Sequence, residues 1–125
     1  MAVKFVGGKM SAKKSSHDAP DRGEVIWLEL TPTAGHEQSG RRPALVLSVR
    51  TFNERRGLAL ICPVTKSPSR SLFQIEIPAN LAVSGTILGD QVRMVDFNAR
   101  HWRSIDVLPP DIVRQVLDTV EMFLV

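Results

Sequence analysis

The sequence predicts a mainly β fold, in which a small, twisted, barrel-like sheet carries one C-terminal helix. Two patterns support this fold class. Between residues 23 and 97, short apolar runs alternate with polar stretches that contain glycine or proline, which is typical of successive strands. Only the last segment, 111–124, places its apolar residues on one face of a helix. A chain of 125 residues suits a single domain.

The first two strands are expected on either side of a polar loop. GEVIWLEL, residues 23–30, has apolar residues on both of its faces, which predicts a strand with one or both faces buried. TPTAGHEQSGRR, residues 31–42, contains the breakers proline and glycine and is expected to be a loop. PALVLSV, residues 43–49, is an almost continuous apolar run, as in a strand covered on both faces, and Pro43 can open it.

The middle of the chain predicts three more strands. NERRG, residues 53–57, is expected to turn the chain into a third strand, LALICPVT, at 58–65. The alternating LFQIEIP at 72–78 follows a second polar loop. GTILGDQVRMVDF, at 85–97, predicts one further strand, in which Gly89 marks a bulge or a close approach of the backbone.

The C-terminal helix has a clear beginning. Pro109 and Pro110 suit its first turn, where a missing N–H has little effect, and Asp111 lies at the positive end of the helix dipole. The apolar stripe beyond them is expected to pack on the sheet.

The N-terminal segment is expected to be separate from this domain. Residues 1–21 lack hydrophobic periodicity, and residues 1–22 carry five basic against two acidic side chains, 5 − 2 = +3. We interpret 1–21 as a basic, disordered arm and 22–125 as a single domain. A nucleic-acid-binding arm is the functional alternative.

The centre of the chain is strongly basic. Residues 41–70 hold seven basic side chains against Glu54 alone, 7 − 1 = +6. Such a concentration suits a phosphate-rich partner, although a solvated arginine-rich surface has the same composition. The basic side chains are Arg41, Arg42, Arg50, Arg55, Arg56, Lys66 and Arg70.

Cysteine and histidine usage argues against disulfides and metal sites. The single cysteine, Cys62, cannot form an intrachain disulfide and is expected to be a small buried apolar residue. The histidines, His17, His36 and His101, have no ligand spacing, so neither a metal nor a cofactor is expected. The chain has no apolar run of membrane-spanning length and no signal peptide, so we expect a cytoplasmic protein without membrane contact.

Polar residues follow or interrupt three of the expected strands. If they converge, they fit metal-independent cleavage of RNA, which needs a base for the ribose 2′-OH, an acid for the leaving oxygen and donors for the phosphorane. Glu37, Asp90 or His36 could be the base, Arg42 can hold a phosphate with two parallel bonds, and Thr65 offers a hydroxyl. Each also has an ordinary structural explanation as a loop residue, strand end or turn cap, and Trp27 is expected in the core.

The order of these segments closely resembles the MazF/PemK family of toxin endoribonucleases, which includes Kid and ChpB. RGEVIWLEL, TPTAGHEQSG and RRPALVLSV resemble the opening of the family, and LALICPVTKS and GTILGDQVRMVDFNAR resemble its next two blocks. The resemblance runs from about Arg22 to the C-terminus and is strongest for the PemK and ChpB branch.

The resemblance implies a small SH3-like β-barrel of the CcdB/MazF type that assembles as a two-fold homodimer. It implies a toxin of a type II toxin–antitoxin system that cleaves single-stranded RNA, mostly mRNA, at a short recognition sequence without a metal. The products would be a 2′,3′-cyclic phosphate and a 5′-hydroxyl. The partner would be an antitoxin whose disordered, acidic C-terminal segment competes with RNA, and DNA would be reached only through that antitoxin.

The resemblance also implies roles for single residues. The arginine and threonine of the family's catalytic signature fall on Arg42 and Thr65, the loop histidine and glutamate on His36 and Glu37, and the "DQ" aspartate on Asp90. The PemK branch has an arginine where this chain has Leu88, so Arg42 is expected to carry most of the acid and phosphate role. RNA contacts are expected from Gln38, Arg41, Lys66, Ser67, Phe73, Gln91 and Arg93.

Two other functions are compatible with the same fold. A non-enzymatic toxin of this barrel type would inhibit a protein such as DNA gyrase, as CcdB proteins do. A plain RNA-binding module would bind RNA without producing cyclic-phosphate ends. The choice of general base among Glu37, His36 and Asp90 also stays open.

Overall fold

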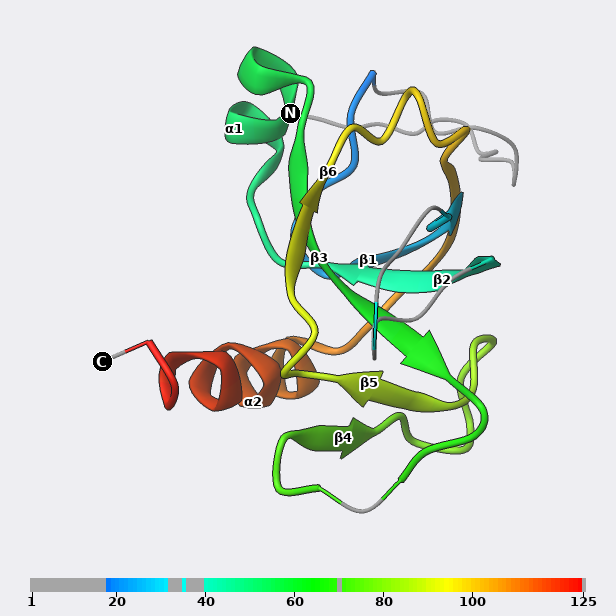
Figure 1. Cartoon of the computed structure of the whole chain (residues 1–125), viewed down its shortest axis with the longest axis vertical. Helices are drawn as coiled ribbons and strands as arrows, with labels where there is room; N and C mark the ends of the chain where they lie inside the picture. Colours follow the sequence, from blue (N-terminus) through cyan, green and yellow to red (C-terminus); the bar gives the residue numbers. More distant parts are fainter. Residues whose placement is uncertain (1–17, 32–34, 36–39, 70, 125) are drawn as a thin grey trace.

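The computed structural model describes residues 18–31, 35, 40–69 and 71–124 (Figure 1). No helix in this part of the chain is long and apolar enough to cross a membrane. In chain order the elements are β1 (Glu24–Glu29), β2 (Arg41–Val46), α1 (Arg50–Arg56), β3 (Ala59–Thr65), β4 (Gln74–Glu76), β5 (Thr86–Leu88), β6 (Arg93–Val95), β7 (Arg103–Val107) and α2 (Pro110–Glu121).

The strands form one antiparallel sheet in the order β4-β5-β3-β2-β1-β7, and β6 pairs with β3. Within the described residues no ladder joins β4 to β7, so the sheet is not closed. Helix α2 crosses beside the sheet at the C-terminal end of the chain (Figure 1). The predicted class, mainly β with a C-terminal helix, is confirmed.

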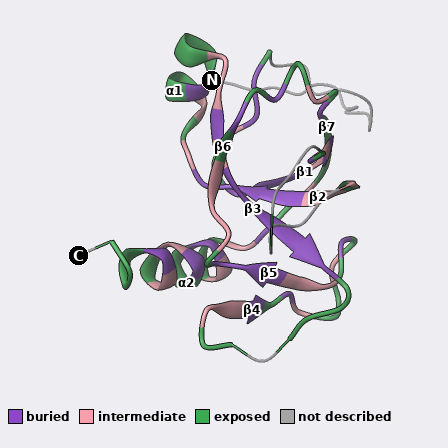
Figure 2. Cartoon of the chain, in the orientation of Figure 1, coloured by how far each residue is buried: buried purple, intermediate pink, exposed green. Residues whose placement is uncertain are grey.

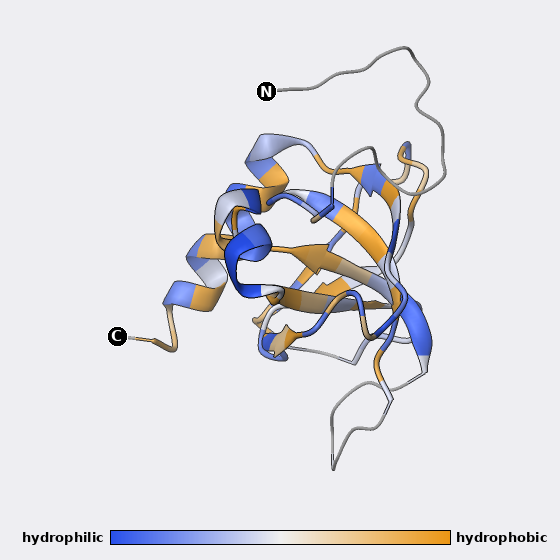
Figure 3. Ribbon diagram, turned by 90° about the horizontal axis from the view of Figure 1, so that it is seen from above, coloured by the Kyte–Doolittle hydropathy of each residue, from blue (hydrophilic) through white to orange (hydrophobic). Residues whose placement is uncertain are grey.

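Each face of the central strands is buried in its own hydrophobic cluster, because successive side chains of a strand point to opposite faces. Val25, Leu45 and Cys62 are cross-strand neighbours in the cluster that contains the apolar face of α2. Ile26 and Ala44 belong to the second cluster, with Phe97 and Trp102 among its members. Figure 2 shows the burial of β1 and β3, and Figure 3 shows that the strands are rich in apolar residues. This burial on both faces explains the almost continuous apolar runs in the sequence.

Several segments differ from the expectation. The segment NERRG was expected to be a turn but belongs to helix α1, which begins at Arg50. The helix forms because Asn53 is buried and hydrogen-bonded, and Gly57 ends it in the left-handed conformation at φ 67°. Strand β7 was not predicted at all.

The expected single strand 85–97 is two strands, β5 and β6, which pair with different parts of β3. The break follows Gly89, whose N–H donates to the Phe73 carbonyl at 2.8 Å. A Cβ at Gly89 would lie 2.6 Å from that oxygen, so the predicted close approach is confirmed. Residues 41 and 42 were expected in a loop but begin β2, where they pair with Glu29 and Leu28.

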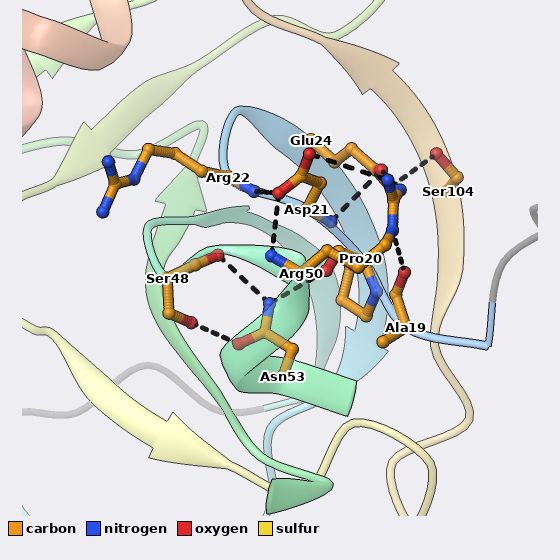
Figure 4. Close-up of polar contacts among 9 residues, drawn as sticks. All are labelled: Ala19, Pro20, Asp21, Arg22, Glu24, Ser48, Arg50, Asn53 and Ser104. Carbon is orange, nitrogen blue, oxygen red and sulfur yellow. Dashed lines mark hydrogen bonds and ion pairs between the residues drawn. The ribbon is translucent and has the colours of Figure 1, made fainter. Parts of the chain in front are cut away.

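The residues directly before β1 are attached to the domain (Figure 4). Ala19 and Pro20 are buried. The Arg50 side chain donates to the Ala19 carbonyl at 3.0 Å and to the Glu24 carboxylate at 2.8 Å, and Asn53 Nδ2 donates to the Pro20 carbonyl at 2.9 Å. The remainder of the predicted arm, residues 1–17, lies outside the described residues.

Candidate functional site

A pocket of about 910 Å³ lies where β1, β2, β3 and β7 meet the loop before Gly85. This volume is in the range of ligand sites. Its lining is rich in cations and hydroxyl groups, which are suited to binding an anion. The side chains that give this character are Arg41, Arg42, Thr65, Lys66, Ser67 and Arg103.

Arg42 and Thr65 come from neighbouring strands, β2 and β3, and both line the pocket. The ladder between these strands reaches Ala44 and Pro63, and each site residue lies two positions beyond the end of that ladder along its own strand. The sheet therefore places a guanidinium and a hydroxyl where both can reach one phosphate.

The hydroxyl of Thr65 is held in a defined position. Thr65 is 4% exposed, and its Oγ1 accepts a hydrogen bond from the Ser67 N–H at 3.1 Å. An oxygen that accepts this bond still has its own O–H to donate. Gly85 lies directly behind: a Cβ there would be 2.7 Å from the Thr65 carbonyl oxygen. Thr65 is therefore oriented from both sides before any ligand is bound.

The loop between β1 and β2 begins and ends at the pocket. The Leu30 N–H donates to the Gly40 carbonyl at 2.9 Å, and the Gly40 N–H donates to Thr31 Oγ1 at 3.0 Å. Both ends of the loop thus lie beside Arg41. Three predicted site residues on this loop, His36, Glu37 and Gln38, lie outside the described residues.

The carboxylate of Glu29 supports the base of this loop. It accepts hydrogen bonds from the hydroxyl and the N–H of Thr31. These bonds, followed by the charges of Arg41 and Arg100, lower the pKa of Glu29. Arg100 also donates to the carbonyls of Glu29 and Thr31, at 2.8 and 3.2 Å. The start of the loop is therefore fixed by several polar contacts.

The other predicted site residues are outside the lining of this pocket. Asp90 is exposed in the turn between β5 and β6 and contributes to raising the pKa of Cys62. Phe73 meets Phe123 edge to face at 5.8 Å.

Gln91 and Arg93 continue from this turn. The backbone N–H of Gln91 donates to the Leu88 carbonyl at 3.1 Å, which closes the turn. Arg93 donates to the Leu30 carbonyl at 3.4 Å, so it reaches the start of the β1–β2 loop. Leu88, which stands where the PemK branch has an arginine, is buried.

Two lining residues were missed as site residues by sequence reasoning, Trp27 and Arg103. Trp27 was expected in the core but is only partly buried and lines the pocket. It pairs with Pro43 on one side and Arg103 on the other, and the guanidinium carbon of Arg41 lies 5.6 Å from its ring centre. No sequence motif marks either residue, because the pairing of β1 with β7 is what brings them together.

Cys62 is buried, as predicted. Burial and the nearby Asp90 raise the pKa of its thiol to about 12, so it stays protonated at neutral pH and is a poor nucleophile. Across the described ranges, no three side chains of His, Cys, Asp or Glu gather into a possible metal site.

Comparisons with known proteins show the family to which the chain is similar. The pattern of the family described as PemK-like, MazF-like toxin of type II toxin–antitoxin system matches residues 21–124. The chain is 35% identical to the endoribonuclease toxin ChpB of Escherichia coli, over 78% of this chain and 87% of ChpB. It is 32% identical to the E. coli endoribonuclease PemK, over 83% of this chain and 81% of PemK.

Solved structures show the same likeness. The structure of MazF from Deinococcus radiodurans has a TM-score of 0.83 and 41% identity, and the alignment covers 86% of this chain and 98% of that one. A MazE–MazF complex from the same organism includes a chain with a TM-score of 0.75 and 35% identity, aligned over 86% of this chain and 97% of that chain.

Proposed function

The chain belongs to the PemK-like, MazF-like toxins of type II toxin–antitoxin systems, and from this we infer that it is the endoribonuclease toxin of such a pair. The observation that carries the chemistry is that Arg42 and Thr65 line the same cationic pocket. We propose that this pocket cleaves single-stranded RNA without a metal and leaves a 2′,3′-cyclic phosphate and a 5′-hydroxyl.

In this reaction the ribose 2′ oxygen attacks the adjacent phosphorus, and the bond to the 5′ oxygen breaks. Arg42 stabilises the charge that develops on the phosphorane and donates a proton to the departing 5′ oxygen. The Thr65 hydroxyl donates to a phosphate oxygen that does not leave. Its hydrogen bond from Ser67 supports this role, because it fixes the oxygen and leaves the O–H for the substrate.

The base that removes the 2′ proton is Glu37 or Asp90, aided by His36. The β1–β2 loop that carries Glu37 and His36 has both its ends at the pocket, which favours Glu37. Asp90, which is outside the lining of the pocket, is the less favoured base. Gln38, Arg41, Lys66 and Ser67 contact the RNA near the cleaved bond, and Phe73, Gln91 and Arg93 contact it farther away.

The chain has an antitoxin as its partner. A MazE–MazF complex is among the similar structures, and a disordered acidic segment would complement the cations of the pocket. Such a segment folds as it binds and competes with RNA. We also propose a homodimer, supported by the exposed apolar side chains of Met94, Met122 and Leu124, and sedimentation would measure it.

The test is incubation of the purified protein with single-stranded RNA in EDTA. Wild type is expected to produce 5′-hydroxyl and cyclic-phosphate ends. Arg42→Ala should lose at least about a hundredfold in rate, because the phosphorane loses its main cationic partner, while the circular dichroism spectrum is retained.

Arg55→Ala is the matched control, since it removes the same charge from an exposed position on α1. Cleavage by Arg42→Ala at the wild-type rate would refute the catalytic assignment. If wild type cut no RNA but inhibited gyrase, or bound RNA without cutting it, one of the two alternative functions would replace the proposal.

A further inference from the structure

Trp27, Arg41 and Arg103 form a second group of side chains in the pocket, separate from the Arg42–Thr65 pair. Arg41 lies over the indole ring at 5.6 Å, and Arg103 is the neighbour of Trp27 across the β1–β7 ladder. All three side chains line the pocket. Neither the fold nor the phosphate chemistry requires an aromatic ring with two guanidinium groups at this position.

The polar groups of this cluster are available to a ligand. Within the described part of the chain, the guanidinium of Arg103 makes no ion pair or hydrogen bond, in contrast to Arg50 and Arg114. The indole N–H of Trp27 also donates to no acceptor in that part of the chain, whereas that of Trp102 donates to Asn98. Trp27 is the aromatic residue of the lining, and its ring is only partly covered by protein.

The two groups belong to one pocket. Trp27 lies on β1 and Thr65 on β3, with β2 between them, and both side chains line the pocket. A phosphate at Thr65 would therefore leave an attached nucleoside within reach of the indole. The pocket volume of about 910 Å³ has room for both.

We propose that Trp27, Arg41 and Arg103 bind and select a nucleobase next to the cleaved bond, and that the selected base is guanine. The base stacks on the indole–guanidinium pair, as bases stack on aromatic and arginine planes. Arg103 has only donors, so it selects a base edge with two adjacent acceptors. On the edge that faces the major groove of a duplex, guanine presents the two acceptors O6 and N7, whereas adenine and cytosine place an amino group there and uracil presents O4 alone. This inference rests on the proposed ribonuclease function.

The first test is the cleavage profile on RNA with a random central sequence. The 5′-hydroxyl ends produced by wild type should be enriched in guanine at one position near the cut. Arg103→Ala should lower the guanine preference at that position by roughly ten- to a hundredfold and leave the other positions unchanged. Trp27→Ala should raise KM more than it lowers kcat, and Trp27→Phe should restore part of the loss because the phenyl ring still stacks.

Arg55→Ala again controls for the loss of one charge and should keep the wild-type profile. An Arg103→Ala profile identical to that of wild type would overturn the proposal while the ribonuclease function stands.

A second test does not depend on cleavage. In a Trp102→Phe background, guanosine 5′-monophosphate should quench the fluorescence of Trp27. The monophosphates of adenosine, cytidine and uridine should do so only at roughly tenfold higher concentration or more. Arg103→Ala should remove this difference in concentration between guanosine monophosphate and the other three nucleotides. If wild type cut no RNA, the proposed function would fail, and selective quenching would still identify a base site. Equal quenching by all four nucleotides would refute guanine selection, and no quenching at all would refute the base site.

Discussion

Gly85 determines how closely β5 can approach Thr65. Its φ of 132° is rare for residues with a side chain, and a Cβ would meet the Thr65 carbonyl oxygen at 2.7 Å. We expect Gly85→Ala to lower the free energy of unfolding by more than about 2 kcal/mol, because backbone strain and a clash with backbone act together. Urea denaturation would measure the stability, and cleavage of RNA in EDTA would show whether displacing Thr65 also slows the reaction.

Gly57→Ala separates the effect of backbone strain from that of the clash at Thr65. Gly57 also has a positive φ, 67°, but a Cβ there would meet no atom within 4 Å. Its substitution should cost about 1 kcal/mol and leave cleavage intact. Equal destabilisation by the two variants would show that the clash at Thr65 has no effect.

Glu24 makes the stability depend on pH. Burial raises the pKa of its carboxyl above the ordinary value of 4.5, although Arg50 opposes this shift. The folded protein therefore holds this proton more tightly than the unfolded chain. The resulting stability is fully present below about pH 4.5 and is lost as the pH rises through the folded-state pKa.

We expect the wild type to lose stability relative to Glu24→Gln between pH 4 and pH 7, because the amide cannot ionise. Urea denaturation of both proteins at several pH values gives the difference. A difference that stayed constant, or that changed in favour of the wild type, would contradict the raised pKa.

At the scale of elements, the buried amide of Asn53 helps to connect helix α1 to the chain before β1. Asn53 is fully buried; its Nδ2 donates to the carbonyls of Pro20 and Ser48, and its Oδ1 accepts from the Ser48 hydroxyl. We expect Asn53→Ala to lower the free energy of unfolding by about 2–3 kcal/mol, because buried carbonyls lose their donors. Urea denaturation checks this value.

Thr51→Ala, an exposed change on the same helix, should alter the stability by less than about 0.5 kcal/mol. If Asn53→Ala matched this control, the amide would have no structural role.

The sequence predicted those elements whose side-chain pattern is set by burial. Strand β3 and helix α2 have strong apolar periodicity, and both were found. Strand β7 was missed because it is an edge strand in which Ile105 and Val107 stay exposed, so no core pattern marks it. Helix α1 was missed because Asn53 and Gly57 are typical turn residues, and only the tertiary contacts of Asn53 favour a helix.

Only part of the candidate site could be predicted from the sequence, because some of its residues belong to local motifs and others do not. Arg42 and Thr65 belong to motifs that can be read along the chain. Trp27 and Arg103 are joined only by the register of β1 with β7, which includes an irregularity between Val25 and Ile26. Trp27 and Arg103 are 76 positions apart (103 − 27). A pairing between such distant residues leaves no local pattern in the sequence.

At the scale of the whole molecule, the domain extends slightly before Arg22. We propose that it begins near Ala19, since Ala19 and Pro20 are buried and Asp21 accepts hydrogen bonds from the backbone N–H groups of Arg22 and Arg50. A protein beginning at residue 18 should be more stable than one beginning at residue 22 by about 2 kcal/mol or more, because the shorter protein leaves buried partners unsatisfied. Thermal and urea denaturation of the two proteins would measure this.

The same comparison locates the boundary of the N-terminal arm. Equal stability of the two proteins would place the boundary at residues 21 and 22, as the sequence alone suggested.

The distribution of the pocket over several strands has a consequence for evolution. Arg42 and Thr65 lie on β2 and β3, whereas Trp27 and Arg103 lie on β1 and β7. Under the base selection proposed above, point mutations in the outer pair would change which transcripts are attacked while the inner pair keeps its geometry. Lineages carrying such toxins could diversify their targets by single nucleotide changes, and an engineer could redirect the enzyme by randomising two codons.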